Sequence, residues 1–267
     1  MNLDTYAKNT WCPGCGNFGI LKAFKNTAMK LIEEGNERGN IVVSSGIGCH
    51  GKISDYLGLP SFHVIHGRVP PFLTGMKLAN PELFAVGFVG DGDALSEGIE
   101  HLVHSAKRNT DITIFLHNNG VFGLTTGQVT PTSPKGFRGR STPYGNPEEP
   151  LNPCALMVVS GASFVARAYA GDIKKLEMVM YEAVTHSGLS FVEILQPCVS
   201  FNNTWKFYNE NVVWTDEIGS DREEALRMCM DTEKIWTGIF YREKRDVYED
   251  IVKDSQVIDI KSLIDLF

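Results

Sequence analysis

Residues 86–128 constrain the fold of this chain more than any other stretch. An apolar run at Phe84–Val89 leads into the segment, a second lies at Ile112–Leu116, and the residues between them are polar and helix-like. Two short, partly β-branched runs separated by one helix predict a strand, helix, strand unit with parallel, buried strands. Open parallel sheets bind ligands at the carboxyl ends of their strands. We therefore expect a binding site where these two runs end.

The chemistry expected at this site is that of a phosphate held through a metal ion. The turn at residues 90–93 reads GDGD, and its glycines let the backbone approach a ligand and offer amides at a helix N-terminus. The aspartates would repel phosphate unless a cation intervened, and Mg²⁺ commonly binds one or two carboxylates together with phosphate oxygens. We expect Asp91, the side-chain oxygen of Asn119 and the carbonyl of Val121 to bind magnesium. An ordinary tight turn followed by a polar loop is the alternative.

Further apolar runs predict an α/β fold with a mostly parallel sheet. The further expected strands are Ile41–Ser45, His63–Arg68, Phe164–Arg167 and Phe191–Leu195. The expected helices are Ile20–Ile32, Pro71–Asn80 and Ile173–Ser187. Residues 128–153 are rich in proline and glycine, which predicts a long loop that serves as a lid or as a contact with another subunit. From Phe201 onward the alternation fades, leaving helical patches at Glu223–Met230 and Tyr248–Val252. We expect this region to be a tail packed on the core or on a neighbouring subunit.

Charge and composition exclude several classes of protein. The formal net charge of −7 argues against nucleic acid as a partner. A basic region followed by an apolar stretch is absent at the N-terminus, and the chain has no apolar run of about 18 residues, so we expect a cytoplasmic protein without a membrane span. Cysteines in such a setting suggest metal or redox chemistry rather than disulfides. Of the 6 cysteines, Cys154 and Cys229 are expected in the core.

The other cysteines form a candidate metal centre. Cys12 and Cys15 make a C-x₂-C pair, a spacing that allows two thiolates to bind one metal ion or one cluster. Cys49 and Cys198 follow predicted strands, at the same edge of the sheet as Asp91. Spacing alone leaves open an iron–sulfur cluster, a zinc site and a redox dithiol.

The motifs WCPGCG, GIGCHGK, HGR, GDGDALSEGIEHLVHSAKRN, HNNGVFGLTTGQ and QPC occur in this order across Trp11–Cys198. GDG followed by NN resembles the diphosphate-binding motif of thiamine diphosphate enzymes. The whole set resembles the β subunit of 2-oxoacid:ferredoxin oxidoreductases, most closely the 2-oxoglutarate and two-subunit branches. The resemblance implies a single thiamine diphosphate-binding domain over residues 1–200 and a C-terminal extension over 201–267.

The resemblance also assigns cofactors and their ligands. It implies a [4Fe–4S] cluster on Cys12, Cys15, Cys49 and Cys198, and the magnesium ligands Asp91, Asn119 and Val121. The residues expected to contact thiamine diphosphate are Gly90, Asp91, Gly92, Asp93, Asn119, Val121, Leu124 and Thr125. His50, Lys52 and Arg68 are candidates for binding the substrate carboxylate, against the alternatives of a packed histidine, a solvated lysine and a surface ion pair.

The implied reaction is oxidative decarboxylation of a 2-oxoacid with coenzyme A, giving acyl-CoA, CO₂ and reduced ferredoxin. 2-Oxoglutarate is favoured, with pyruvate and branched-chain 2-oxoacids as other candidates. Enzymes of this kind place a glutamate against the aminopyrimidine, and the chain has no second α/β domain to supply it. We therefore expect an α subunit as partner, with γ and δ subunits as further candidates. The competing hypotheses are a thiamine enzyme without a cluster and a zinc-stabilised scaffold or binding subunit.

Overall fold

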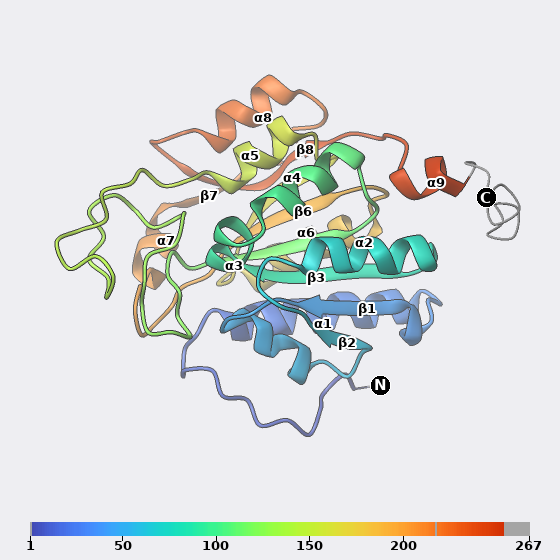
Figure 1. Ribbon diagram of the computed structural model, residues 1–267, viewed down its shortest axis with the longest axis horizontal. Helices are drawn as coiled ribbons and strands as arrows, with labels where there is room; N and C mark the ends of the chain where they lie inside the picture. Colours follow the sequence, from blue (N-terminus) through green and yellow to red (C-terminus); the bar gives the residue numbers. More distant parts are fainter. Residues whose placement is uncertain (1, 217, 254–267) are drawn as a thin grey trace, which may run out of the picture.

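The computed structural model describes residues 2–216 and 218–253. An eight-stranded sheet with the order β2-β1-β3-β4-β6-β5-β8-β7 runs through the described chain (Figure 1). Its strands are β1 (Ile41–Ser45), β2 (Ser61–His63), β3 (Phe84–Gly90), β4 (Thr113–Asn118), β5 (Phe164–Tyr169), β6 (Ser190–Leu195), β7 (Val212–Trp214) and β8 (Ile235–Arg242). The helices are α1 (Asn17–Glu33), α2 (Val69–Ala79), α3 (Asp91–Ser96), α4 (Ile99–Arg108), α5 (Pro153–Ser160), α6 (Ile173–Thr185), α7 (Trp205–Asn211), α8 (Arg222–Cys229) and α9 (Tyr248–Lys253), with short 3₁₀ turns at Arg38–Asn40 and His50–Tyr56.

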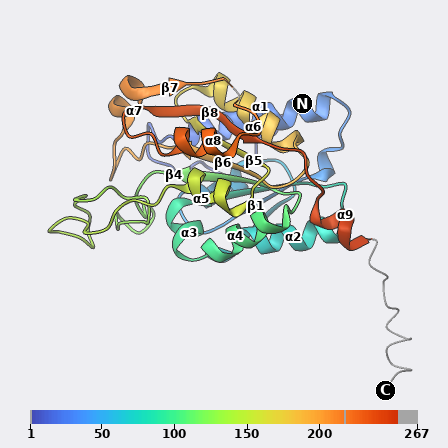
Figure 2. The same cartoon turned by 90° about the horizontal axis from the view of Figure 1, so that it is seen from above.

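Helices cover both faces of the sheet (Figure 2). Apolar residues of α1 and α6, among them Phe24 and Met180, pack against one face together with Phe88 of β3. α2, α4, α5 and α8 pack against the other face, where β3 contributes Val89. Side chains alternate across a strand, so β3 supplies both cores and is buried along almost its whole length. Among the residues described, no helix has the length and apolar character needed to cross a bilayer.

The mostly parallel sheet expected from the sequence is confirmed. β1, β2, β3, β4, β6 and β5 are parallel neighbours, and β8 adds to β5 in the antiparallel direction. The expectation that strand structure fades after Phe201 is wrong, because β7 and β8 extend the same sheet. The register between β5 and β8 shifts at Val165/Ala166, and Gly238 takes the left-handed conformation with φ of +140°. The final part of the expected extension, residues 254–267, lies outside the described residues.

Two elements differ from those expected. The strand expected at His63–Arg68 is wrong, because β2 ends at His63 and the following residues form a turn. The single helix expected after the GDGD turn is two helices, α3 and α4, separated at Gly98. A Cβ atom on Gly98 would lie 2.3 Å from the carbonyl oxygen of Gly67, so the HGR turn packs directly on the backbone at this break.

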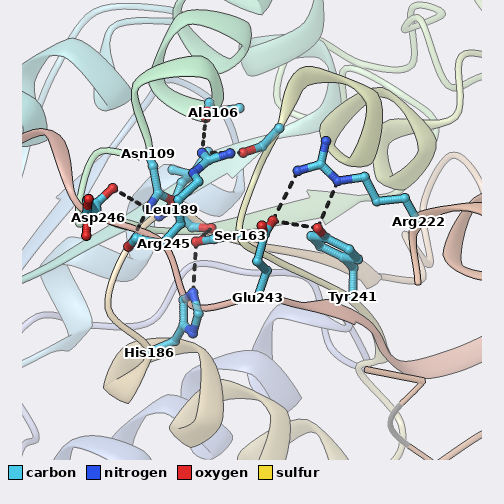
Figure 3. Close-up of polar contacts among 11 residues, drawn as sticks. Ala106, Asn109, Ser163, His186, Leu189, Arg222, Tyr241, Glu243, Arg245 and Asp246 are labelled. Atoms are coloured by element: carbon cyan, nitrogen blue, oxygen red, sulfur yellow. Dashed lines mark hydrogen bonds and ion pairs between the residues drawn. The ribbon is translucent and has the colours of Figure 1, made fainter. Parts of the chain in front are cut away.

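A network of hydrogen bonds connects the segment after β8 to the end of the sheet where the parallel strands begin (Figure 3). Arg245 donates to the carbonyls of Ala106 (3.2 Å) and Gly161 (2.7 Å) at the C-terminal ends of α4 and α5. Asn109 donates to the carbonyls of Arg245 and Asp246 while its side-chain oxygen accepts from the amide before β6. A cation at helix C-termini complements their dipoles. The network lies where the parallel strands begin, and it holds the segment after β8 against the ends of α4 and α5.

Candidate active site

Four neighbouring strands carry the predicted site residues to one edge of the sheet. β1, β3, β4 and β6 lie side by side, and each is parallel to the next. Cys49 follows β1, Asp91 follows β3, Asn119 follows β4 and Cys198 follows β6. The carboxyl ends of parallel strands lie at one edge, so these residues from distant parts of the sequence meet there.

One cavity at this edge, which we call the turn cavity, surrounds the GDGD turn. It encloses about 410 Å³, including its open mouth. Lining residues expected from the sequence to contact the cofactor are Gly90, Asp91, Gly92, Asp93, Asn119, Val121, Leu124 and Thr125. His50 lines the same cavity. The structure therefore brings the complete expected set together.

Two glycines of the turn are required by packing. A Cβ atom on Gly90 would lie 2.6 Å from Nδ1 of His50, and one on Gly92 would lie 2.4 Å from the ring of Phe122. Contacts this close between heavy atoms are repulsive, so any larger residue would force the rings away from the turn. The imidazole of His50 and the phenyl ring of Phe122, which line the cavity, thus pack directly against the backbone of Gly90 and Gly92.

Asp91 is a buried carboxylate held by hydroxyl groups of the 128–153 loop. Its side chain is 2% exposed, and the Oγ1 atoms of Thr130 and Thr132 each lie 2.6 Å from Oδ2. Burial raises the pKa of Asp91, although the two threonine contacts oppose this effect. A buried carboxylate of this kind is stabilised when a cation binds beside it. The donor set at the cavity therefore fits a divalent metal.

The threonines were missed by the sequence analysis. The loop between β4 and α5 extends well beyond the sheet in Figure 1, and the expected long loop over residues 128–153 lies within it. Residues 130–133 of this loop nevertheless reach the site. Thr130, Thr132 and Ser133 are buried, and the hydroxyl of Ser133 donates to the carbonyl of Gly120 at 2.6 Å. Threonines in a proline-rich loop carry no signal in the sequence, because only the folded chain brings them to Asp91.

Asp93 ties the loops after β1 and β2 to the turn. Its Oδ1 atom lies 2.9 Å from Nδ1 of His66 and accepts from the amides of Gly67 and Ile47, while Oδ2 lies 3.3 Å from Nε2 of His50. Burial would raise the pKa of Asp93, but these contacts outweigh it and hold the pKa below its usual value. Oδ1 of Asp93 is thus engaged by protein groups, whereas the buried Oδ2 faces His50 without a hydrogen bond.

The three candidates for the substrate carboxylate occupy different places. His50 is buried in the turn cavity, whereas Lys52 is half-buried and lines a second cavity beside Cys49. Arg68 lines neither of these two cavities. Its Nη1 atom donates to the carbonyl of Glu97 at 2.5 Å and lies 3.8 Å from the Glu100 carboxylate. His50 and Lys52 are therefore brought to the site, whereas Arg68 is bonded outside both cavities.

The second cavity, which we call the cysteine cavity, contains the four predicted ligand cysteines. It encloses about 650 Å³ including its mouth, and Cys12, Cys15, Cys49 and Cys198 all line it. Hydrogen bonds to backbone carbonyls hold the three loops together. The Gly16 amide donates to the Pro197 carbonyl at 3.1 Å, and Nε1 of Trp11 donates to the Cys49 carbonyl at 2.6 Å.

The four thiols line one cavity and come from three separate loops. Among the described residues, no group of three His, Cys, Asp or Glu side chains is already arranged to hold a single metal ion. Burial raises the pKa of Cys15 to about 11 and also raises that of Cys49. These thiols are therefore protonated without a metal, and metal binding would release protons.

The two cavities share one wall. Cys49, Asn119, Gly123 and Leu124 line both of them. A Cβ atom on Gly123 would lie 3.6 Å from Sγ of Cys49 and 3.7 Å from Sγ of Cys198, so the backbone here runs directly past the sulfurs. A group bound in the turn cavity and a cluster bound in the cysteine cavity would be neighbours.

A buried ion pair underlies the site and was also missed by the sequence analysis. Nε of Arg167 in β5 lies 2.7 Å from Oε2 of Glu193 in β6, and Oε1 of Glu193 accepts from Asn118 at 2.7 Å. Thr132 lies 2.8 Å from Oδ1 of Asn118, which connects this pair to the loop that holds Asp91. Cys154 contacts Glu193 at 3.2 Å and is buried, as is Cys229, so the expected core positions of both cysteines are confirmed.

Comparisons with known proteins agree with this geometry. Residues 46–194 match the family of the thiamine pyrophosphate enzyme C-terminal TPP-binding domain. Residues 198–256 match the family that covers the C-terminal region of the pyruvate ferredoxin oxidoreductase β chain. The fold and the turn cavity thus define the diphosphate-binding domain of a thiamine diphosphate enzyme. The chain belongs to the family of 2-oxoacid:ferredoxin oxidoreductase β subunits.

The relatives that establish this family span most of the chain. A 2-oxoacid:ferredoxin oxidoreductase subunit beta from Sulfolobus sp. is 40% identical, covering 92% of this chain and 86% of the relative. The 2-oxoglutarate oxidoreductase subunit KorB of Mycobacterium tuberculosis is 46% identical, covering 72% of this chain and 51% of its own length. A structure of 2-oxoglutarate:ferredoxin oxidoreductase from Magnetococcus marinus, with 2-oxoglutarate, coenzyme A and succinyl-CoA bound, superposes with a TM-score of 0.91 at 33% identity. The superposition covers 99% of this chain and 94% of that one.

Proposed function

We propose that this chain is the β subunit of an enzyme that decarboxylates a 2-oxoacid oxidatively with coenzyme A, releasing acyl-CoA and CO₂ and reducing ferredoxin. The observation that carries the proposal is the shared wall between the turn cavity and the cysteine cavity. A reaction that removes electrons from a substrate on one cofactor and passes them to a second needs the two groups close together. 2-Oxoglutarate is the favoured substrate, in line with the names of the relatives.

Magnesium and the diphosphate of thiamine belong to the turn cavity in this proposal. Asp91, the side-chain oxygen of Asn119 and the carbonyl of Val121 are the metal ligands. The burial of Asp91, which raises its pKa, supports this assignment because a bound cation would offset the cost of the charge. Because Gly90 and Gly92 have no side chains, the rings of His50 and Phe122 pack directly on this backbone, and its amides are proposed to contact the diphosphate.

A [4Fe–4S] cluster belongs to the cysteine cavity, with Cys12, Cys15, Cys49 and Cys198 as its ligands. When bound, thiamine diphosphate supplies the carbanion chemistry of decarboxylation and the cluster accepts electrons singly. The protein orients these groups: Trp11 fixes the backbone of Cys49, and the Cys12–Cys15 turn is held by a 3.0 Å bond from the Cys15 amide to the Cys12 carbonyl.

Lys52 is the better candidate for the substrate carboxylate. It is a cation at the cysteine cavity, close enough to Cys49 to oppose the rise of that thiol's pKa. His50, packed against Gly90 and Asp93, is proposed to shape the turn cavity and to exclude water from it. Arg68 already donates to the carbonyl of Glu97, so we propose that it stabilises the HGR turn and does not bind the substrate.

The proposed enzyme needs an α subunit, which supplies the glutamate for the aminopyrimidine and the rest of the substrate pocket. γ and δ subunits are further candidate partners, ferredoxin is the proposed electron acceptor, and the cytoplasm is the proposed location. We propose that residues 1–200 hold the cofactors and that residues 201–267 are an extension of this domain. The two parts share one sheet, because β7 and β8 continue it.

The test is a substrate panel on the assembled complex. Ferredoxin or dye reduction is followed with 2-oxoglutarate, pyruvate and branched-chain 2-oxoacids, with coenzyme A present and absent. The proposal expects the highest rate with 2-oxoglutarate and dependence on coenzyme A. A colourless, anaerobically purified complex with stoichiometric zinc would instead support the zinc-stabilised scaffold and refute the proposal.

A further inference from the structure

Gln196 is a buried amide at the boundary between the two cavities. It follows β6 and precedes Pro197 and Cys198, and its side chain is 1% exposed. It lines the cysteine cavity but is neither a cysteine ligand nor a proposed magnesium ligand. A buried amide must satisfy its donors and its acceptor within the protein, so its partners reveal which groups it holds in place.

The three contacts of Gln196 fix the orientation of its amide. Nε2 donates to the Pro197 carbonyl at 2.7 Å and reaches Sγ of Cys15 at 3.6 Å. Oε1 accepts from Nδ2 of Asn119 at 3.0 Å. The opposite orientation would set the Gln196 oxygen against a carbonyl and its NH₂ group against that of Asn119, which removes the hydrogen bonds at both ends.

The same contacts fix the amide of Asn119. Because Nδ2 of Asn119 donates to Gln196, its Oδ1 atom lies on the other side, where it accepts from the Val121 amide at 3.0 Å. The backbone carbonyl of Asn119 accepts from Nδ2 of Asn202 at 2.9 Å. Only Oδ1 can bind a metal ion, since the NH₂ group has no lone pair to offer. The acceptor of Gln196 and the Val121 amide thus together orient Asn119 so that Oδ1 is the atom available to magnesium.

The donor of Gln196 acts on the other cavity. A hydrogen bond to a ligand sulfur stabilises the additional negative charge of a reduced cluster, and such bonds are among the factors that set its potential. Ser200 makes a comparable contact, with its Oγ donating to Sγ of Cys12 at 3.2 Å. Gln196 differs from Ser200 because its other end is bonded to Asn119.

We propose that Gln196 is a positioning residue that joins the magnesium site to the cluster site by orienting Asn119 with its oxygen and bonding Cys15 with its nitrogen. The inference rests on the proposed function. It assigns one side chain two effects that are measured separately, the affinity for magnesium with thiamine diphosphate and the midpoint potential of the cluster.

The decisive variant is Gln196→Leu, measured in the anaerobically purified complex. Loss of a group that orients a metal ligand typically weakens metal binding by about 10- to 100-fold. We expect a weakening in this range by calorimetric titration of magnesium and thiamine diphosphate, and a midpoint potential shifted to more negative values in a redox titration followed by electron paramagnetic resonance. Wild-type iron content and normal assembly of the complex show that the variant has folded.

Two further variants separate the two effects. Ser200→Ala is the matched control, because it removes a hydrogen bond to a ligand sulfur without touching the contact to Asn119. It should shift the potential and leave magnesium affinity at the wild-type value. Gln196→Glu keeps an oxygen for Asn119, but only its protonated form can donate to the Pro197 carbonyl as Nε2 does. At a pH where this carboxyl group is protonated, its magnesium affinity should exceed that of Gln196→Leu while its potential is still shifted.

The outcomes distinguish this inference from the proposed function. If wild type binds magnesium with thiamine diphosphate and contains the cluster, but Gln196→Leu alters neither value or only one of them, Gln196 does not join the sites and the inference fails alone. Reduced stability with unchanged affinity and potential would make Gln196 a packing residue, which also overturns it. A wild-type complex that contains no cluster and does not bind the cofactor refutes the proposed function and the inference together.

Discussion

Asp91→Asn is expected to separate stability from cofactor binding. Asparagine has the shape of aspartate, and its side-chain oxygen can take the position of Oδ2 and accept from Thr130 and Thr132 as before. Burial raises the pKa of Asp91, which means that the ionised carboxylate is unfavourable at pH 7 when no cation is bound. Without magnesium and thiamine diphosphate, the variant complex should therefore unfold at the wild-type temperature or above it.

When magnesium and thiamine diphosphate are added, wild type should unfold at a higher temperature than Asp91→Asn. A ligand present at 100 times its dissociation constant stabilises the protein that binds it by about 2.7 kcal/mol. Wild type should gain this amount with magnesium and thiamine diphosphate, while Asp91→Asn should gain little because it has lost the charged ligand. Asp55→Asn, a change at an exposed aspartate, is the control and should gain as much as wild type.

The assay is thermal unfolding of the assembled complex with and without magnesium and thiamine diphosphate, supported by calorimetric titration. The reasoning is refuted if Asp91→Asn is stabilised by the cofactor as much as wild type. It is also refuted if the variant is much less stable than wild type in the absence of the cofactor, because Asp91 would then stabilise the fold by itself.

Three other changes have defined expected outcomes. Glu193→Ala leaves the buried guanidinium of Arg167 without its carboxylate, so denaturant unfolding should show a loss of about 3–5 kcal/mol, and a loss below about 1 kcal/mol would contradict the pairing. Cys198→Ser should lower iron and sulfide content while Cys229→Ala leaves both unchanged, and full occupancy in Cys198→Ser would remove it from the ligand set. Burial lowers the pKa of His186 to about 4, so the unfolded chain binds a proton there that the folded chain does not, and stability should fall as pH drops from about 6.5 toward 4. His186→Asn should lose less stability than wild type between pH 7 and pH 5, and equal losses would exclude this source of acid sensitivity.

The central part of the fold follows from local sequence patterns. The runs that form β1, β3, β4 and β6 are short and apolar, and a glycine, aspartate, asparagine or cysteine stands within the next three residues of each, which predicts both the strands and the edge where the site lies. The parallel direction of these strands could be inferred because helices connect them. The meeting of Cys12 and Cys15 with Cys49 and Cys198 was expected from the family resemblance, because a C-x₂-C pair ahead of the first helix does not by itself show which edge of the sheet it meets.

The features that the sequence did not reveal depend on contacts between distant segments. β8 is strand-like, IWTGIFYR, but it lies among charged residues and contains Gly238, and its pairing with β5 is irregular between Ile239 and Tyr241. Thr130 and Gln196 are ordinary polar residues whose importance comes from the groups that they touch, Asp91 and Asn119. No local pattern encodes these partners.

The proposal that the two cavities hold a decarboxylation site and its electron acceptor is tested most directly by electron paramagnetic resonance of the anaerobic complex. Adding 2-oxoglutarate without ferredoxin should produce the signal of a reduced [4Fe–4S] cluster in wild type. Asp91→Asn should retain its iron and give no signal with the substrate, although dithionite should still reduce the cluster. A complex without iron, or a signal that appears equally in Asp91→Asn, would contradict the account.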